Sequence, residues 1–102
     1  MKLSAKRADI NFEYEFNSGD VAEFTYTAPS TQQMEDALEV SKQEDAKSML
    51  EFSKKVLKEN LSGDKKLIKK MIEELETYGD IYDFKETLDI AVGKLKKKRK
   101  NG

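Results

Sequence analysis

Paired carboxylates are the side chains of this 102-residue sequence that best fit acid–base chemistry, and the candidates are Glu73, Glu74, Asp80 and Asp83. The sequence contains no histidine and no cysteine, so the usual general base, the commonest metal ligand and all thiolate ligands are missing. The four carboxylates fall at predicted helix ends or on polar helix faces, without an accompanying nucleophile, phosphate loop or ligand cluster. We therefore predict a protein that is not an enzyme and that uses no cofactor or metal ion.

Basic side chains are concentrated in the second half of the chain. Residues 1–46 have a charge balance of −6 and residues 47–102 a balance of +5. Six of the seven residues 94–100 are cationic, which is enough for weak contacts with phosphates. However, no aromatic residue is interleaved with them, and the sequence pI is about 5.6, whereas nucleic-acid-binding domains usually have a pI above about 9. A solvated helix end that complements its own dipole explains the run without a ligand, so nucleic acid is only the alternative partner.

A second group of lysines opens the predicted third helix, while glutamates close it, an order that opposes the helix dipole. These lysines either serve a partner with an acidic surface or occupy exposed positions without a function. The residues that could contact an acidic partner or nucleic acid are Lys65, Lys66, Lys69, Lys70, Lys96, Lys97, Lys98, Arg99 and Lys100.

Methionine and tyrosine are the expected ingredients of a protein-binding patch, because methionine adapts its shape and tyrosine is amphipathic. Core packing is the first interpretation for any of them on an apolar face. The residues we predict to contact a partner protein are Tyr14, Phe24, Tyr26, Met34, Leu38, Tyr78 and Tyr82.

The elements that must position these residues begin with a β-hairpin. Aromatic and polar residues alternate over residues 9–17 and again over 20–28, and the turn-forming run Asn17-Ser18-Gly19-Asp20 lies between them. Each strand therefore has one aromatic face, which needs a layer of helices to cover it.

Helical periodicity takes over after Pro29. We predict a short helix over 31–40 with a capping box at Ser30 and Gln33, then a longer helix over 44–60 that begins at a second box, Ser41 with Glu44. A third helix is expected to start after Asp64 and to end at Gly79, and Asp80 is expected to cap a last helix that ends near Leu95.

The predicted fold class is α+β, an N-terminal antiparallel β-hairpin followed by three to four amphipathic helices. Residues 1–95 form a single domain, and residues 96–102 form a basic tail that frays into solvent. Residues 1–9 contain no apolar run typical of a signal peptide, and no stretch is long enough to span a bilayer. The expected location is the cytoplasm of a bacterial host cell.

The hairpin also carries a family resemblance. The run Tyr14-Glu15-Phe16-Asn17-Ser18-Gly19-Asp20-Val21-Ala22-Glu23-Phe24-Thr25-Tyr26-Thr27-Ala28-Pro29, followed by a polar cap and a helix with Met and Leu, resembles the small tail assembly chaperones of long-tailed bacteriophages, including the Mu-like group. The pattern covers residues 12–40. It implies a non-enzymatic assembly chaperone or adaptor that binds the tape measure and tail tube proteins. The alternatives are a small nucleic-acid-binding regulator, a structural virion subunit, or a protein that associates with itself.

Overall fold

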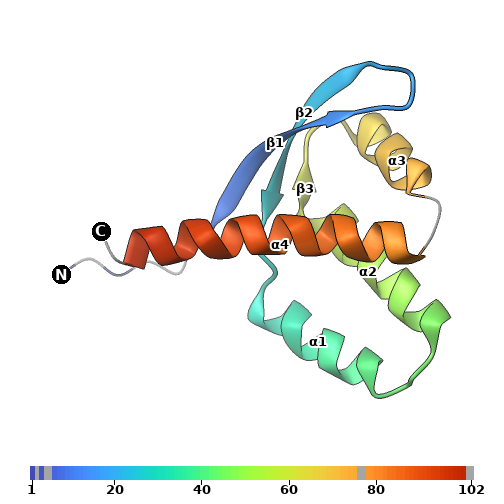
Figure 1. Ribbon diagram of the computed structural model, residues 1–102. Coiled ribbons are helices and arrows are strands. Elements are labelled where there is room, and N and C mark those ends of the chain that lie inside the picture. Colours follow the sequence, from blue (N-terminus) through green and yellow to red (C-terminus); the bar gives the residue numbers. More distant parts are fainter. Residues whose placement is uncertain (2, 4–5, 76–77, 101–102) are drawn as a thin grey trace.

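The computed structural model describes residues 1, 3, 6–75 and 78–100, with the side chains of all of these except 78–79 and 95–100. The chain forms an antiparallel hairpin followed by helices, which confirms the predicted α+β class (Figure 1). The elements in chain order are β1 (Asp9–Glu15), β2 (Val21–Thr27), α1 (Thr31–Ser41), α2 (Ala46–Asn60), β3 (Leu61–Ser62), α3 (Lys65–Glu74) and α4 (Tyr78–Lys100).

The hairpin has the register that the alternating pattern requires. Ile10 pairs with Tyr26, Phe12 with Phe24 and Tyr14 with Ala22, so the apolar residues of both strands share one face of the sheet. The sequence did not indicate β3, whose two residues pair with Thr25 and Tyr26 of β2 and give the strand order β1-β2-β3.

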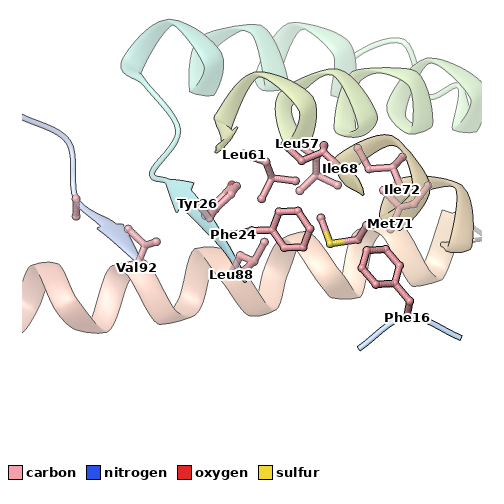
Figure 2. Packing of buried hydrophobic residues seen from close by; sticks show 12 residues of the cluster. Phe16, Phe24, Tyr26, Leu57, Leu61, Ile68, Met71, Ile72, Leu88 and Val92 are labelled. Atoms are coloured by element: carbon pink, nitrogen blue, oxygen red, sulfur yellow. The ribbon is translucent and has the colours of Figure 1, made fainter. Parts of the chain in front are cut away.

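The core lies between the aromatic face of this sheet and the helices α2, α3 and α4. Figure 2 shows Phe24 beside Met71, with Leu88 of α4 on one side of Phe24 and Leu57 of α2 on the other. The rings of Phe12 and Phe84 meet edge to face at 6.0 Å, and Lys70 places its Nζ 5.0 Å from the centre of the Phe16 ring. The expectation that helices cover the aromatic face of the hairpin is therefore confirmed.

The two helices after Pro29 begin at side-chain caps. Ser30 and Gln33 form the predicted capping box at the start of α1. The second predicted box, Ser41 with Glu44, is wrong: Asp45 is the N-cap of α2 and accepts from the backbone N–H of Lys47. The chain reaches Asp45 through Glu44, whose φ of 51° lies in the left-handed region, so Glu44 belongs to the connection and not to the helix.

The junction between the last two helices also differs from the prediction. Leu75 leaves helical geometry (φ −83°, ψ 85°) and packs against the core, so α3 ends at Glu74. Gly79 therefore does not cap α3 but lies in the first turn of α4, together with Asp80. The helix α4 continues to Lys100 instead of ending near Leu95, so residues 96–100 of the predicted tail 96–102 belong to the helix. Residues 101–102 of that tail lie outside the described residues.

β1 is an edge strand of the sheet. Ala8 accepts a hydrogen bond from Ala28, and Phe16 donates one to Asp20, so the even-numbered residues of β1 direct their backbone groups toward β2. The backbone groups of Asp9, Asn11 and Glu13 consequently point away from the sheet. None of the described helices has both the length and the apolar character that a bilayer crossing requires.

Candidate protein-docking groove

A groove runs between α1 and α4, with α2 as its floor. It consists of two hollows of about 360 and 410 Å³, which share Ala37, Phe52, Lys85 and Asp89 and are therefore adjacent. The first hollow is also lined by Met49, Ser53, Tyr82, Glu86 and Ile90. The second is also lined by Ala28, Pro29, Gln33, Met34, Val56, Val92 and Gly93.

The first wall, α1, is held to the molecule by few contacts. None of its eleven residues, all of which the structure describes, is buried. Gln33 exchanges two hydrogen bonds with Asn60 at the end of α2, one donated by Gln33 at 2.9 Å and one donated by Asn60 at 3.0 Å. Figure 1 shows α1 on the opposite side of α2 and α4 from the hairpin. Met34 and Ala37 of α1 thus lie at the groove instead of in the core.

The second wall is a stripe of α4 distinct from its core-facing stripe. Ile81, Leu88 and Val92 are buried against the sheet and the other helices. Tyr82, Lys85, Glu86, Asp89, Ile90 and Gly93 recur at three- and four-residue spacing on the neighbouring side of the helix and line the groove. One helix therefore presents a core face and a groove face.

A polar cluster lies in the middle of the groove. The buried Tyr26 of β2 donates a hydrogen bond of 2.6 Å to Asp89, and the Lys85 ammonium group lies 2.8 Å from the other carboxylate oxygen. Burial, and then the Asp89 carboxylate, raise the pKa of Tyr26 above its ordinary value, so its hydroxyl remains a donor. The cluster ties the sheet to α4 and leaves Lys85 and Asp89 at the groove surface.

Large apolar side chains are exposed around this groove. Met34 is 60% exposed, Tyr82 50% and Ile90 52%, and all three line it. Leu38, 66% exposed, lies one turn beyond Met34 and lines a neighbouring hollow on α1. Single exposed apolar residues are ordinary, whereas a gathering of them around a groove is typical of binding surfaces.

Five of the seven predicted partner-binding residues divide into two sets. Met34, Leu38 and Tyr82 lie at or beside the groove. Phe24 and Tyr26 are 3% and 0% exposed, so the prediction that they contact a partner is wrong for this conformation. Both residues lie on the aromatic face of β2, which the helices cover as predicted, so their side chains belong to the core.

Tyr14 lies away from the groove, beside the end of α3. Its hydroxyl donates to Glu74 at 2.9 Å, and the Glu74 carboxylate also accepts from the backbone N–H of Asn17. Burial and the Glu74 carboxylate raise the pKa of Tyr14 to about 12. This contact joins the hairpin turn to α3. The side chain of Tyr78 lies outside the described residues.

The four predicted basic contact residues whose side chains the structure describes do not line the groove. Lys65, Lys66, Lys69 and Lys70 are exposed on α3, which lies near the hairpin turn (Figure 1). The side chains of Lys96, Lys97, Lys98, Arg99 and Lys100 lie outside the described part of the chain.

The sequence analysis did not identify several of the groove residues. Ile90 gave a usable signal, because it lies half a helical turn from Ile81 and so cannot belong to the same buried stripe. No sequence pattern marked Ala37, Phe52 and Lys85, since their shared position depends on how three helices cross. No group of three or more His, Cys, Asp or Glu residues that could hold a metal ion occurs among the described residues.

No family model, curated protein or solved structure matches this chain.

Proposed function

We propose that this protein is a non-enzymatic adaptor or assembly chaperone that binds a partner protein in the groove between α1 and α4. The observation that carries the proposal is the gathering of exposed Met34, Tyr82 and Ile90 around a groove with an apolar floor. A groove of this kind buries the apolar face of a partner segment and shields it from water.

Phage tail assembly is the specific role that we propose, on the strength of the hairpin motif. The residues that resemble the tail assembly chaperones, Tyr14 to Pro29, fold as the strand–turn–strand unit that the resemblance requires. The proposed partners are the tape measure and tail tube proteins, and the proposed location is the cytoplasm of the host cell.

A pull-down with tape measure and tail tube proteins tests this role. We expect retention of at least one of them, and we expect the double variant Met34→Asp, Ile90→Asp to lose it. The matched control is Val21→Asp, because Val21 is 56% exposed on the outer side of β2, away from the groove. Failure to bind either protein would remove the phage role, and equal loss with the control would remove the groove.

The same purified protein discriminates the alternatives. A nucleic-acid-binding regulator using the exposed lysines of α3 would retain DNA or RNA with a steep salt dependence. A structural virion subunit would sediment as a ring of defined size.

A further inference from the structure

We infer that residues 1–6 of one copy of this chain add as an antiparallel strand to the open edge of β1 in a second copy, so that two copies form a dimer by reciprocal exchange. The inference concerns a surface apart from the groove and does not depend on what the groove binds. It follows from the open edge, from the alternating pattern of residues 1–6 and from the path of the chain that joins them.

The edge of β1 is open on its backbone and only half covered on its apolar side. The backbone groups of Asp9, Asn11 and Glu13 point away from β2. On the side that faces the core, Phe12 is only partly buried, whereas its neighbour Phe24 in β2 is 3% exposed. A further strand beside β1 would accept and donate hydrogen bonds at this edge and would cover the exposed part of its apolar side chains.

The first six residues have the pattern of such a strand. Apolar and polar residues alternate along them, in the order Met1, Lys2, Leu3, Ser4, Ala5 and Lys6. Met1 and Leu3 are almost fully exposed, at 111% and 87%, so both apolar side chains are open to solvent in the single chain. A strand pattern with exposed apolar residues indicates a segment that pairs in a complex.

The path of the chain directs this segment to a second copy and not to its own β1. The backbone N–H of Ala28 donates to the carbonyl oxygen of Ala8 at 2.8 Å, and Arg7 Nη1 donates to the carbonyl oxygen of Ala28 at 3.2 Å. These bonds hold Arg7 and Ala8 beside the end of β2, in continuation of the β1–β2 pairing. A return of residues 1–6 onto their own β1 would need a tight turn at these two residues, which would break both bonds.

One antiparallel register satisfies both faces of the added strand. Each apolar residue of the segment then lies opposite an apolar residue of β1 in the second copy, in the pairs Met1 with Tyr14, Leu3 with Phe12, and Ala5 with Ile10. On the outer face, Lys2 lies opposite Glu13, at a position where β1 directs its backbone outward. A shift by one residue would place Lys2 opposite Phe12, on the apolar side.

This register can form twice in one dimer. Its centre falls between Arg7 and Ala8, which belong to neither strand and therefore form the crossing between the two halves. A two-fold axis at this point pairs each segment with the β1 edge of the other copy, and both open edges are covered.

Charge favours residues 1–6 over a second β1 as the added strand. The antiparallel register that pairs the whole of β1 with another β1 places Asp9 opposite Glu15, and like charges that lie directly opposite are destabilising. Glu13 already faces Glu23 across the hairpin. A lysine on its other side, Lys2 of the second copy, supplies the opposite charge.

Sedimentation equilibrium of the full chain tests the dimer. We expect a monomer–dimer equilibrium, and we expect Leu3→Asp to raise its dissociation constant at least about tenfold, because the change occurs at both halves of the dimer. The matched control is Leu38→Asp, the same change at a leucine of α1 that is 66% exposed. It should alter the dissociation constant by less than about twofold, since α1 lies apart from the β1 edge.

Exchanged charges test the register. Glu13→Lys and Lys2→Glu alter the net charge in opposite directions, yet each should raise the dissociation constant about threefold to tenfold, because each places like charges opposite one another. The double variant has the net charge of the wild type and re-forms the pair with its charges exchanged. Its dissociation constant should return to within about threefold of the wild-type value.

Hydrogen exchange followed by NMR locates the interface. At a concentration where the wild type is dimeric, the outward amides of Asn11 and Glu13 should exchange at least about tenfold more slowly in the wild type than in Leu3→Asp. The amide of Phe12 is the control, because it is directed toward β2 in both proteins and should differ by less than about threefold.

Each contrary result overturns the inference. A chain that stays monomeric up to about 1 mM would leave the edge of β1 to a strand from a different protein. A dimer that Leu3→Asp does not weaken, or that Leu38→Asp weakens equally, would place the interface elsewhere. A double charge variant no better than the single variants, or edge amides that gain no protection in the dimer, would remove the proposed pairing. The pull-down is a separate readout, so failure of the groove and failure of this dimer are distinguishable.

Discussion

Gly63 shows how a single residue position controls the packing of the sheet. It follows β3 directly and has a φ of +147°. A Cβ there would lie 2.9 Å from Cδ1 of Phe24 and 3.5 Å from the carbonyl oxygen of Glu23. Phe24 is 3% exposed and packed in the core, so it cannot move aside without disturbing its neighbours. Only glycine combines this backbone geometry with this contact.

Substitution of two glycines by alanine should therefore have opposite effects. We expect Gly63→Ala to lower the free energy of unfolding by about 1–3 kcal/mol, because it adds both backbone strain and a clash. The control, Gly93→Ala, makes the same chemical change in an exposed helix position with open space and should raise that free energy by up to about 1 kcal/mol. Urea unfolding followed by circular dichroism measures both. A stable Gly63→Ala variant would contradict the packing at β3.

At the scale of elements, α1 is the least anchored helix. It has no buried residue, and the reciprocal hydrogen bonds between Gln33 and Asn60 are its best-defined link to α2. Asn60 is 4% exposed, so these bonds form in a largely water-excluded place where they stabilise more than on the surface.

Loss of this link should release α1 before the rest of the molecule. In Asn60→Ala we expect backbone amides of α1 to exchange with deuterium about tenfold faster, while those of β2 change less, because α1 opens as a local unit. The matched control is Gln32→Ala, which removes only a hydrogen bond to Asp36 inside α1. Hydrogen-exchange mass spectrometry gives both rates. Equal acceleration in α1 and β2 would mean that α1 does not open separately.

The elements also show what the sequence could predict and why. The hairpin and the capping box at Ser30 follow from local patterns, since strand alternation and side-chain caps involve neighbouring residues. The sequence did not predict β3, because a strand of two residues, Leu61 and Ser62, is too short to show an alternating pattern. The sequence also did not predict where α3 ends, because Leu75 leaves the helix to pack against residues that are distant in the sequence. The groove as a whole depends on the crossing of α1, α2 and α4, which no periodicity encodes. Met34, Leu38 and Tyr82, which we predicted to contact a partner, are exposed at or beside it.

At the scale of the whole molecule, the chain is flat and expanded. Its extents are 46 × 37 × 19 Å and its radius of gyration is 14.7 Å, compared with about 13 Å for a compact domain of 100 residues. Two tyrosines hold the layers of this thin structure together, Tyr14 between the hairpin and α3, and Tyr26 between β2 and α4.

These tyrosines predict loss of stability in alkali. The pKa of Tyr14 is raised to about 12 in the folded protein, and burial raises the pKa of Tyr26 as well, whereas an unfolded tyrosine titrates near 10. A raised folded pKa contributes stability that is fully present below pH 10 and is lost as the pH increases from about 10 through 12. We expect the free energy of unfolding to fall over that range.

The variant Tyr26→Phe isolates one of the two contributions. At pH 8 its free energy of unfolding should be about 1–3 kcal/mol lower than that of the wild type, because Asp89 loses a hydrogen-bond donor. It should also lose less stability between pH 9 and 11 than the wild type, since one of the two titrating groups is gone. Urea unfolding at a series of pH values measures this difference. Identical slopes would contradict the role of Tyr26.

The open edge of β1 has a consequence for how the molecule behaves at high concentration. Its outward backbone groups could template the addition of further strands, and the exposed Glu13 and Glu15 place like charges wherever two such edges meet. Replacing both with threonine would retain the strand and remove the repulsion, so fibrillar aggregates detected by thioflavin fluorescence are the expected result. We therefore predict that Glu13 and Glu15 oppose the pairing of two such edges.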